Sequence, residues 1–239
     1  MGSVLVTVVA SSRPLIQTTA AEITLNAGES QTVDVAQYAT NPFADRGPLQ
    51  VLPSPGVTDG GTASASGTQI TISANSGFNG SFMVTYRLQD ATADTEREVQ
   101  GTITATVRDK PDAPTAMTAE SNTSQSAILS WTAGAANGAP ITGYTVTDHT
   151  QGDSKDCGVN TQCIFTGRTN GQNHTFSVTA TNEVGESAPS NQASVNIDIE
   201  PETPAAPTAT PGDHEITVTW TEPHNEGSPI TNYEVSLRG

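Results

Sequence analysis

The feature that most constrains the fold of this chain is a stretch that occurs twice. Residues 131–144 read WTAGAANGAPITGY and residues 220–233 read WTEPHNEGSPITNY, so both begin with Trp-Thr, contain Gly-x-Pro-Ile-Thr and end with Tyr. The distance between the copies, from Trp131 to Trp220, is about 90 residues, which is the length of one β-sandwich domain rather than of a helical repeat unit. The sequence therefore predicts tandem domains.

Short runs that alternate apolar and polar residues indicate strands. Examples are Gln69-Ile70-Thr71-Ile72 and Phe176-Ser177-Val178-Thr179, and such runs are separated by Gly, Pro, Asn and Asp clusters. Apolar spacing of three and four residues is nearly absent, so helices are not expected. We predict an all-β chain of tandem Ig-like antiparallel β-sandwiches.

The net charge of the chain limits the classes of partner that it can bind. It carries 25 acidic and nine basic residues, a net charge of −16, which repels phosphate backbones and anionic lipids. Nucleic-acid binding and direct membrane contact are therefore not expected, and the apolar run at residues 4–9 is too short to span a bilayer. Met1-Gly2-Ser3 has the look of a cloning remnant.

Proline-containing hinges divide the chain. Residues 4–10 are β-prone and precede Ser11-Ser12-Arg13-Pro14, much as residues 102–107 precede Arg108-Asp109-Lys110-Pro111. We therefore interpret residues 1–13 as the cloning remnant followed by the last strand of a truncated preceding domain. The alternative is that residues 4–10 form the first strand of the domain that follows. The first whole domain spans 14–110, with strands expected at 22–26, 31–35, 49–52, 69–73, 81–89 and 99–107.

Within this first domain, residues 74–90 contain Gly77-Phe78-x-Gly80 and then a strand ending in Tyr86 and Asp90. Together with Thr32-Val33-Asp34-Val35 this resembles the cadherin-like, bacterial Ig-like domains of large surface proteins, with an actinobacterial source as the expectation. Many members of that family bind calcium after their second strand. Here the corresponding run, residues 39–46, has few carboxylates, and Asn41 and Asp45 alone do not supply the six to eight oxygens that calcium takes. Calcium is therefore possible but not expected, and no other cofactor is expected.

The second domain spans 111–199, with strands expected near 115–120, 126–132, 141–149, 154–158, 162–166, 174–182 and 192–197. Alternation places Trp131, Tyr144, Phe176 and Val178 on inward faces, with Trp220 and Tyr233 as their counterparts in the next copy. Trp131, the Gly138–Ile141 turn and the run from Phe176 to Asn182 resemble bacterial fibronectin type III domains. The resemblance implies a seven-strand sandwich.

Two residues depart from the fibronectin type III pattern. Arg168 stands where the family has Leu, and His174 stands where it has an aromatic residue, often a Tyr whose hydroxyl bonds to the backbone. We expect His174 to make that bond through a ring nitrogen, or the corner to be looser. A metal-ligand role is disfavoured, since no second ligand lies at a useful spacing.

Cys157 and Cys163 are the only cysteines. Their spacing suits a disulfide between neighbouring strands, unlike the two-residue gap of zinc and redox motifs; two free thiols are the alternative. A disulfide indicates an oxidising, extracytoplasmic setting.

A third domain, 200–239, begins within the proline-rich linker 199–207 and contains only three expected strands. So short a piece cannot bury a normal core. One hypothesis is strand complementation, with residues 4–9 of a second copy completing an open edge.

No catalytic motif is present, and His149, His174, His214 and His224 are scattered. We therefore expect no enzyme, no metal and no catalytic residue, but a structural or adhesive stalk segment of a large bacterial surface protein. The alternatives are accessory modules of a secreted polysaccharide-degrading enzyme, or decorations of a phage or injection-machine tail. Expected partners are neighbouring modules and surface proteins or glycans, and the candidate contact loop is Glu183-Val184-Gly185-Glu186, whose alternative is a plain acidic turn.

Overall fold

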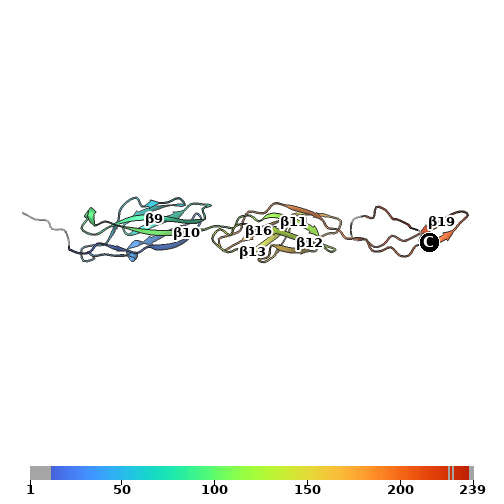
Figure 1. Ribbon diagram of the computed structural model, residues 1–239, viewed down its shortest axis with the longest axis horizontal. Helices are drawn as coiled ribbons and strands as arrows, with labels where there is room; N and C mark the ends of the chain where they lie inside the picture. The colour runs from blue at the N-terminus through green and yellow to red at the C-terminus, as the bar shows by residue number, and fades with distance from the viewer. Residues whose placement is uncertain (1–11, 226, 228, 237–239) are drawn as a thin grey trace, which may run out of the picture. The chain divides into compact units, whose positions relative to one another are not determined.

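The structure, a computed structural model, describes residues 12–225, 227 and 229–236. The chain divides into two compact units, residues 1–109 and 110–239, which we describe separately (Figure 1). The predicted strand at residues 4–10 lies outside the described residues. Within the described part, no helix has the length and apolar character needed to cross a membrane.

Unit 1 is a sandwich of two sheets. The first has the order β2-β10-β9-β5, with β6 also pairing with β9, and the second has the order β3-β8-β7. The strands of the first sheet are β2 (Ala21–Asn26), β5 (Gln50–Val51), β6 (Gly56–Val57), β9 (Gly80–Gln89) and β10 (Val99–Arg108). The remaining elements are β1 (Gln17–Thr18), β3 (Ser30–Asp34), β4 (Ala39–Thr40), β7 (Gly61–Ser66), β8 (Gln69–Ala74) and the short 3-10 helices η1 (Val35–Tyr38) and η2 (Thr95–Arg97), with β1 pairing β4.

Alternation along β9 and β10 builds the core of unit 1. Every second residue of β9 from Phe82 to Leu88 is buried, as are Ile103, Ala105 and Val107 of β10, because successive side chains of a strand point to opposite faces. Gly101 is needed opposite Tyr86, since a Cβ there would lie 2.3 Å from the tyrosine ring.

The first and last long strands of unit 1 are neighbours. β2 and β10 pair in parallel over six residues, from Ala21–Ile103 to Asn26–Arg108, and β10 also pairs antiparallel with β9, beside it in Figure 1. The two ends of unit 1 are therefore joined directly by a ladder of backbone hydrogen bonds.

Unit 2 contains a seven-strand sandwich over residues 115–196. Its sheets have the orders β11-β12-β15 and β14-β13-β16-β17. The strands are β11 (Thr115–Ser121), β12 (Ser126–Thr132), β13 (Gly143–Asp148), β14 (Asp153–Asp156), β15 (Gln162–Thr166), β16 (Asn173–Thr181) and β17 (Ala193–Asn196). All seven overlap the expected ranges, and the all-β prediction is confirmed.

The predicted core residues of this sandwich are buried. Trp131, Tyr144, Phe176 and Val178 are each at most 6% exposed, and the rings of Trp131 and Tyr144 lie 5.4 Å apart between centroids. In unit 1 the sequence missed β7, because Gly61-Thr62-Ala63-Ser64-Ala65-Ser66 is poor in the β-branched and aromatic residues that mark strands.

In the second copy of the repeat, the Trp and Tyr rings pack against each other as in the first copy, but they are not buried. After the sandwich come β18 (Thr208–Pro211) and β19 (Ile216–Thr219), which pair with each other. The rings of Trp220 and Tyr233 lie 5.3 Å apart, yet these side chains are 41% and 38% exposed. Their predicted core position is thus wrong here, because no second sheet faces them among the described residues.

Candidate functional site: the anchored linkers

The repeated loop of unit 2 holds the segment through which the chain enters this unit. The segment is Lys110–Ala113 and the loop is Gly134–Ala139, between β12 and β13. The amide of Asp112 donates to the carbonyl of Ala135 at 2.9 Å. Gly134 allows this approach, since a Cβ there would lie 2.3 Å from the Asp112 carbonyl oxygen.

The side chain of Asn137 makes two further hydrogen bonds to the segment Lys110–Ala113. Its Nδ2 donates to the Lys110 carbonyl at 2.8 Å and to Asp112 Oδ1 at 3.0 Å. Asn137 has a φ of +52°, a left-handed conformation that Asn tolerates better than most residues. One side chain thereby binds the backbone and the carboxylate of the linker.

The predicted contact loop, Glu183–Glu186, closes the same end of the sandwich. Asn182 shapes it, because its Oδ1 accepts from the amides of Val184 and Gly185 while its Nδ2 donates to Ala136. At Gly185 a Cβ would lie 3.0 Å from Lys110 Cε. The loop therefore contacts the linker of its own unit, a role that the sequence did not suggest; whether it also meets a partner stays a prediction.

The second copy of the loop repeats the arrangement. The amide of Glu202, in the next linker, donates to the His224 carbonyl at 3.0 Å, and His224 is the counterpart of Ala135. A Cβ on Gly227 would lie 2.4 Å from the Ile199 carbonyl. Gly227 thus approaches the linker backbone closely in this copy, as Gly134, at a different position of the loop, does in the first.

The linker that enters unit 1 is held by different residues. Arg97 donates to the carbonyls of Arg13 and Pro14 at 3.1 and 2.7 Å, and its Nε donates to Asp90 at 3.0 Å. Burial raises the pKa of Asp90, but hydrogen bonds from Thr92 and Arg97 lower it by more, so its pKa lies below the usual value. Asp90 therefore stays charged and orients Arg97.

Phe43 completes this anchor. The guanidinium groups of Arg13, Arg46 and Arg97 lie 4.8, 5.3 and 4.9 Å from its ring centroid, within the range of cation–π attraction. Asp45, one of the two candidate calcium ligands, pairs instead with Arg13. Asn41, the other one, bonds to the backbone of Phe43 and Gly47, so both side chains serve to shape the loop.

Arg168 and His174, the two departures, meet in one buried network. The Arg168 guanidinium contacts Asp148 at 2.6 Å and Asp153 at 2.7 Å, and His174 Nδ1 donates to Asp148 Oδ2 at 2.8 Å. Burial raises the pKa of Asp148, but the hydrogen bonds from Arg168 and His174 lower it by more, leaving the pKa below its usual value. His174 thus bonds through a ring nitrogen, but its short bond is to the Asp148 carboxylate rather than to the backbone; its Nε2 lies 3.4 Å from the Thr169 carbonyl oxygen.

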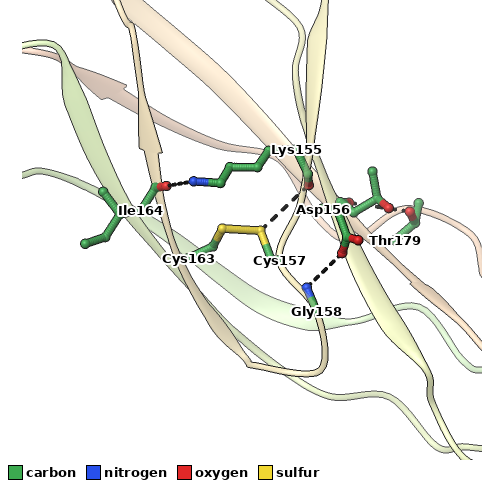
Figure 2. Close-up of a disulfide and its surroundings, with 8 residues drawn as sticks. Lys155, Asp156, Cys157, Gly158, Cys163, Ile164 and Thr179 are labelled. Carbon is green, nitrogen blue, oxygen red and sulfur yellow. Dashed lines mark hydrogen bonds between the residues drawn. A yellow bond between two sulfur atoms is a disulfide. The ribbon is translucent and has the colours of Figure 1, made fainter.

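A disulfide joins Cys157 and Cys163, with their Cα atoms 5.7 Å apart. Figure 2 shows it linking the segment after β14 to β15, which belong to different sheets. Beside it, Lys155 Nζ donates to the Ile164 carbonyl of β15 at 2.6 Å. This flank of the sandwich is therefore closed by one covalent bond and one side chain.

One pair of side chains has nucleophile and base character. His149 Nε2 lies 2.9 Å from Ser177 Oγ, a contact that no motif in the sequence predicted. Ser177 is only 4% exposed, so its hydroxyl is not open to a substrate. The described residues contain no group of three or more His, Cys, Asp or Glu side chains that could hold a metal ion.

The two-sheet architecture of unit 2 defines an immunoglobulin-like β-sandwich. Residues 112–196 match the family model of the fibronectin type III domain. No curated protein matches the sequence.

Solved structures are similar at low identity. Titin domains A168–A170 match at 16% identity over 76% of this chain and 65% of that one, with a TM-score of 0.42. The twitchin kinase region from C. elegans (Fn31-NL-kin-CRD-Ig26) matches at 28% identity over 37% of this chain and 17% of that one, with a TM-score of 0.33. The chain thus spans less than two thirds of either structure.

Proposed function

We propose that the chain is a non-catalytic stalk segment of a large bacterial surface protein, in which cadherin-like and fibronectin type III domains space or present an adhesive end. The anchored linkers carry this proposal. Each linker is bonded to the domain that follows it, by Arg97 in unit 1, by Asn137 in unit 2 and by the His224 carbonyl beyond it. A spacer needs such restraint, because a free linker would let each joint bend.

The strand order of unit 1 also suits a segment that is pulled at its ends. The parallel pair β2–β10 joins the first and last long strands, so a pull along the chain loads its hydrogen bonds together rather than one after another. In unit 2 the amide of Asn191 bridges β11 to the segment before β17, bonding to the Met117 amide at 3.0 Å and its carbonyl at 3.2 Å.

The disulfide supports a location outside the cytoplasm. Disulfides persist in oxidising compartments and are rare where thiols are kept reduced, and a surface of strong negative charge favours solubility. We assign the segment to the cell surface or wall, with other modules of the same chain and surface proteins or glycans as its contacts.

Nuclear magnetic resonance tests the anchoring. We expect backbone order parameters of about 0.85 for Lys110–Ala113, falling below about 0.6 in Asn137→Ala and unchanged in the control Asn160→Ala. Asn160 is exposed and lies in the loop between the cysteines. Order parameters below about 0.6 in the unaltered chain would refute a restrained linker.

A labelling experiment tests the location. In producing cells, an impermeant reagent or an antibody should reach unit 2 without lysis. Reaction only after lysis would refute a surface role.

A further inference from the structure

One flank of the sandwich of unit 1 carries a groove between two strand edges. A two-sheet sandwich has two flanks, at each of which an edge strand of one sheet faces an edge strand of the other. At one flank of unit 1 the Val51 amide of β5 donates to the Gly67 carbonyl, beside β7 and β8, at 2.8 Å. At the other flank β2 and β3 are the edge strands.

Between β2 and β3 runs a groove of about 620 Å³. Its walls include three consecutive residues of β2 (Glu22–Thr24) and four of β3 (Gln31–Asp34). Because side chains alternate between the faces of a strand, a wall of consecutive residues is a strand edge rather than a face. The outward backbone amides and carbonyls of these edges therefore line the groove.

Unit 2 provides the contrast. One of its flanks is closed by the disulfide and by the bond from Lys155 to Ile164. The other is closed by Asn191 and by Ser121, whose hydroxyl bonds to the backbone of Asp198 at 2.9 and 3.1 Å. The β2–β3 flank of unit 1 is bridged at one end, where β1 pairs with β4 and the Thr19 amide donates to the Tyr38 carbonyl at 2.8 Å. Between this bridge and the turn at residues 27–29, the edges of β2 and β3 both face the groove.

The lining of the groove indicates what it can accept. It is polar, with Gln31, Gln37 and Gln69 among the side chains, and its charged residues are Glu22 and Asp34. Charged edge residues discourage unspecific strand pairing, and two carboxylates repel a second acidic strand. An apolar strand finds no matching wall there, since Ile23 and Val33 are buried in the core.

We propose that the β2–β3 groove of unit 1 binds an extended basic peptide segment of another protein by β-strand addition. A strand seated on either edge would form about three backbone hydrogen bonds over five or six residues. Lysine or arginine at every second position would face Glu22 and Asp34, and small polar residues would fill the other face. Backbone hydrogen bonds to the strand edge would provide the affinity, and the carboxylates of Glu22 and Asp34 would select a basic peptide.

Fluorescence anisotropy of the full chain with labelled heptapeptides tests this proposal. The probe is Thr-Lys-Thr-Lys-Thr-Lys-Thr at about 0.15 M salt, with a glutamate version and a version carrying N-methyl groups on alternate backbone amides as controls. We expect binding of the first probe only, weakened about fivefold by Glu22→Lys. The matched control Glu120→Lys makes the same charge change on an exposed strand residue of unit 2 and should leave binding unchanged.

Several results would overturn the proposal. Equal binding of the N-methylated peptide would show attraction without strand pairing, and equal loss in both variants would show attraction to net charge. Self-association of the chain that is abolished by Glu22→Lys would identify a second copy as the occupant. Glu22 is exposed, so the variant should fold, and an unchanged thermal midpoint checks this. Hydrogen exchange in the bound state should slow at residues 22–24 or 31–34, and slowing elsewhere alone would place the peptide at another site.

Discussion

Replacing Asp148 by asparagine tests whether the buried network stabilises unit 2. Asp148 and Asp153 both pair with Arg168, at 2.6 and 2.7 Å, but their side chains are 0% and 50% exposed. Asp153→Asn is therefore a matched control that removes the same charge from the same guanidinium in a solvated position.

The burial of the two carboxylates sets the expected difference. Removing one partner of a buried ion pair costs about 3–5 kcal/mol because it leaves a charge uncompensated. Since Asp153 still faces Arg168, we place the loss in the free energy of unfolding for Asp148→Asn at about 3 kcal/mol. The exposed control should cost less than about 1 kcal/mol.

Urea unfolding followed by Trp131 fluorescence measures both losses. Trp131 is buried in unit 2, and a Trp220→Phe background makes it the sole tryptophan. With an m-value near 1.5 kcal/mol/M, the midpoint should fall by about 2 M in Asp148→Asn and by less than about 0.7 M in Asp153→Asn. Equal, small shifts would refute the view that Asp148 is desolvated and paired.

The pH dependence has a definite sign. The folded pKa of Asp148 lies below its ordinary value, so its stabilisation is present above the unfolded pKa, near 4, and is lost as the pH falls through the folded pKa. Unit 2 should therefore lose stability below about pH 4, and Asp148→Asn should lose less over that range. An identical acid dependence in both proteins would contradict this assignment.

Two further predictions use internal comparisons. Replacing Cys157 and Cys163 by serine should lower the unfolding free energy of unit 2 by about 2 kcal/mol, because the bridge closes a short loop in the unfolded chain. A reductant should lower the urea midpoint of the unaltered chain but not that of the variant. An equal effect of the reductant on both proteins would contradict a stabilising role of the disulfide. Trp131 alone, in Trp220→Phe, should emit at shorter wavelength than Trp220 alone, in Trp131→Phe, since the two side chains are 6% and 41% exposed; matching spectra would contradict their different burial.

The fold was predictable where the sequence repeats simple patterns. Alternation indicated strands such as β12, β13 and β16 in unit 2 and the buried positions of Trp131 and Phe176, because burial on one face enforces a period of two. β7 was missed because its small polar residues carry no such signal. The exposure of Trp220 was also missed, since an identical local motif says nothing of whether a second sheet covers it.

The anchoring contacts could not be read from the sequence because they join distant backbone atoms. Asn137 bonds to Lys110 and Arg97 to Arg13, across 27 and 84 residues. Spacing does not encode contacts of this kind. The disulfide is the exception: its sequence separation is six, and prediction needed only that the two strands be neighbours. His174 lies between these cases, since its departure from the family pattern indicated an altered bond without naming Asp148.

The repeated stretch acquires a second role from these contacts. Its Trp and Tyr pack against each other in both copies, at 5.4 and 5.3 Å, while the loop between them bonds to the preceding linker in both copies. Burial differs between the copies and linker contact does not. The backbone bond to the linker is therefore common to both copies, whereas the glycine that approaches the linker is Gly134 in the first copy and Gly227, at a different position of the loop, in the second. In both copies, the loop that binds the preceding linker lies between the Trp and the Tyr that pack against each other.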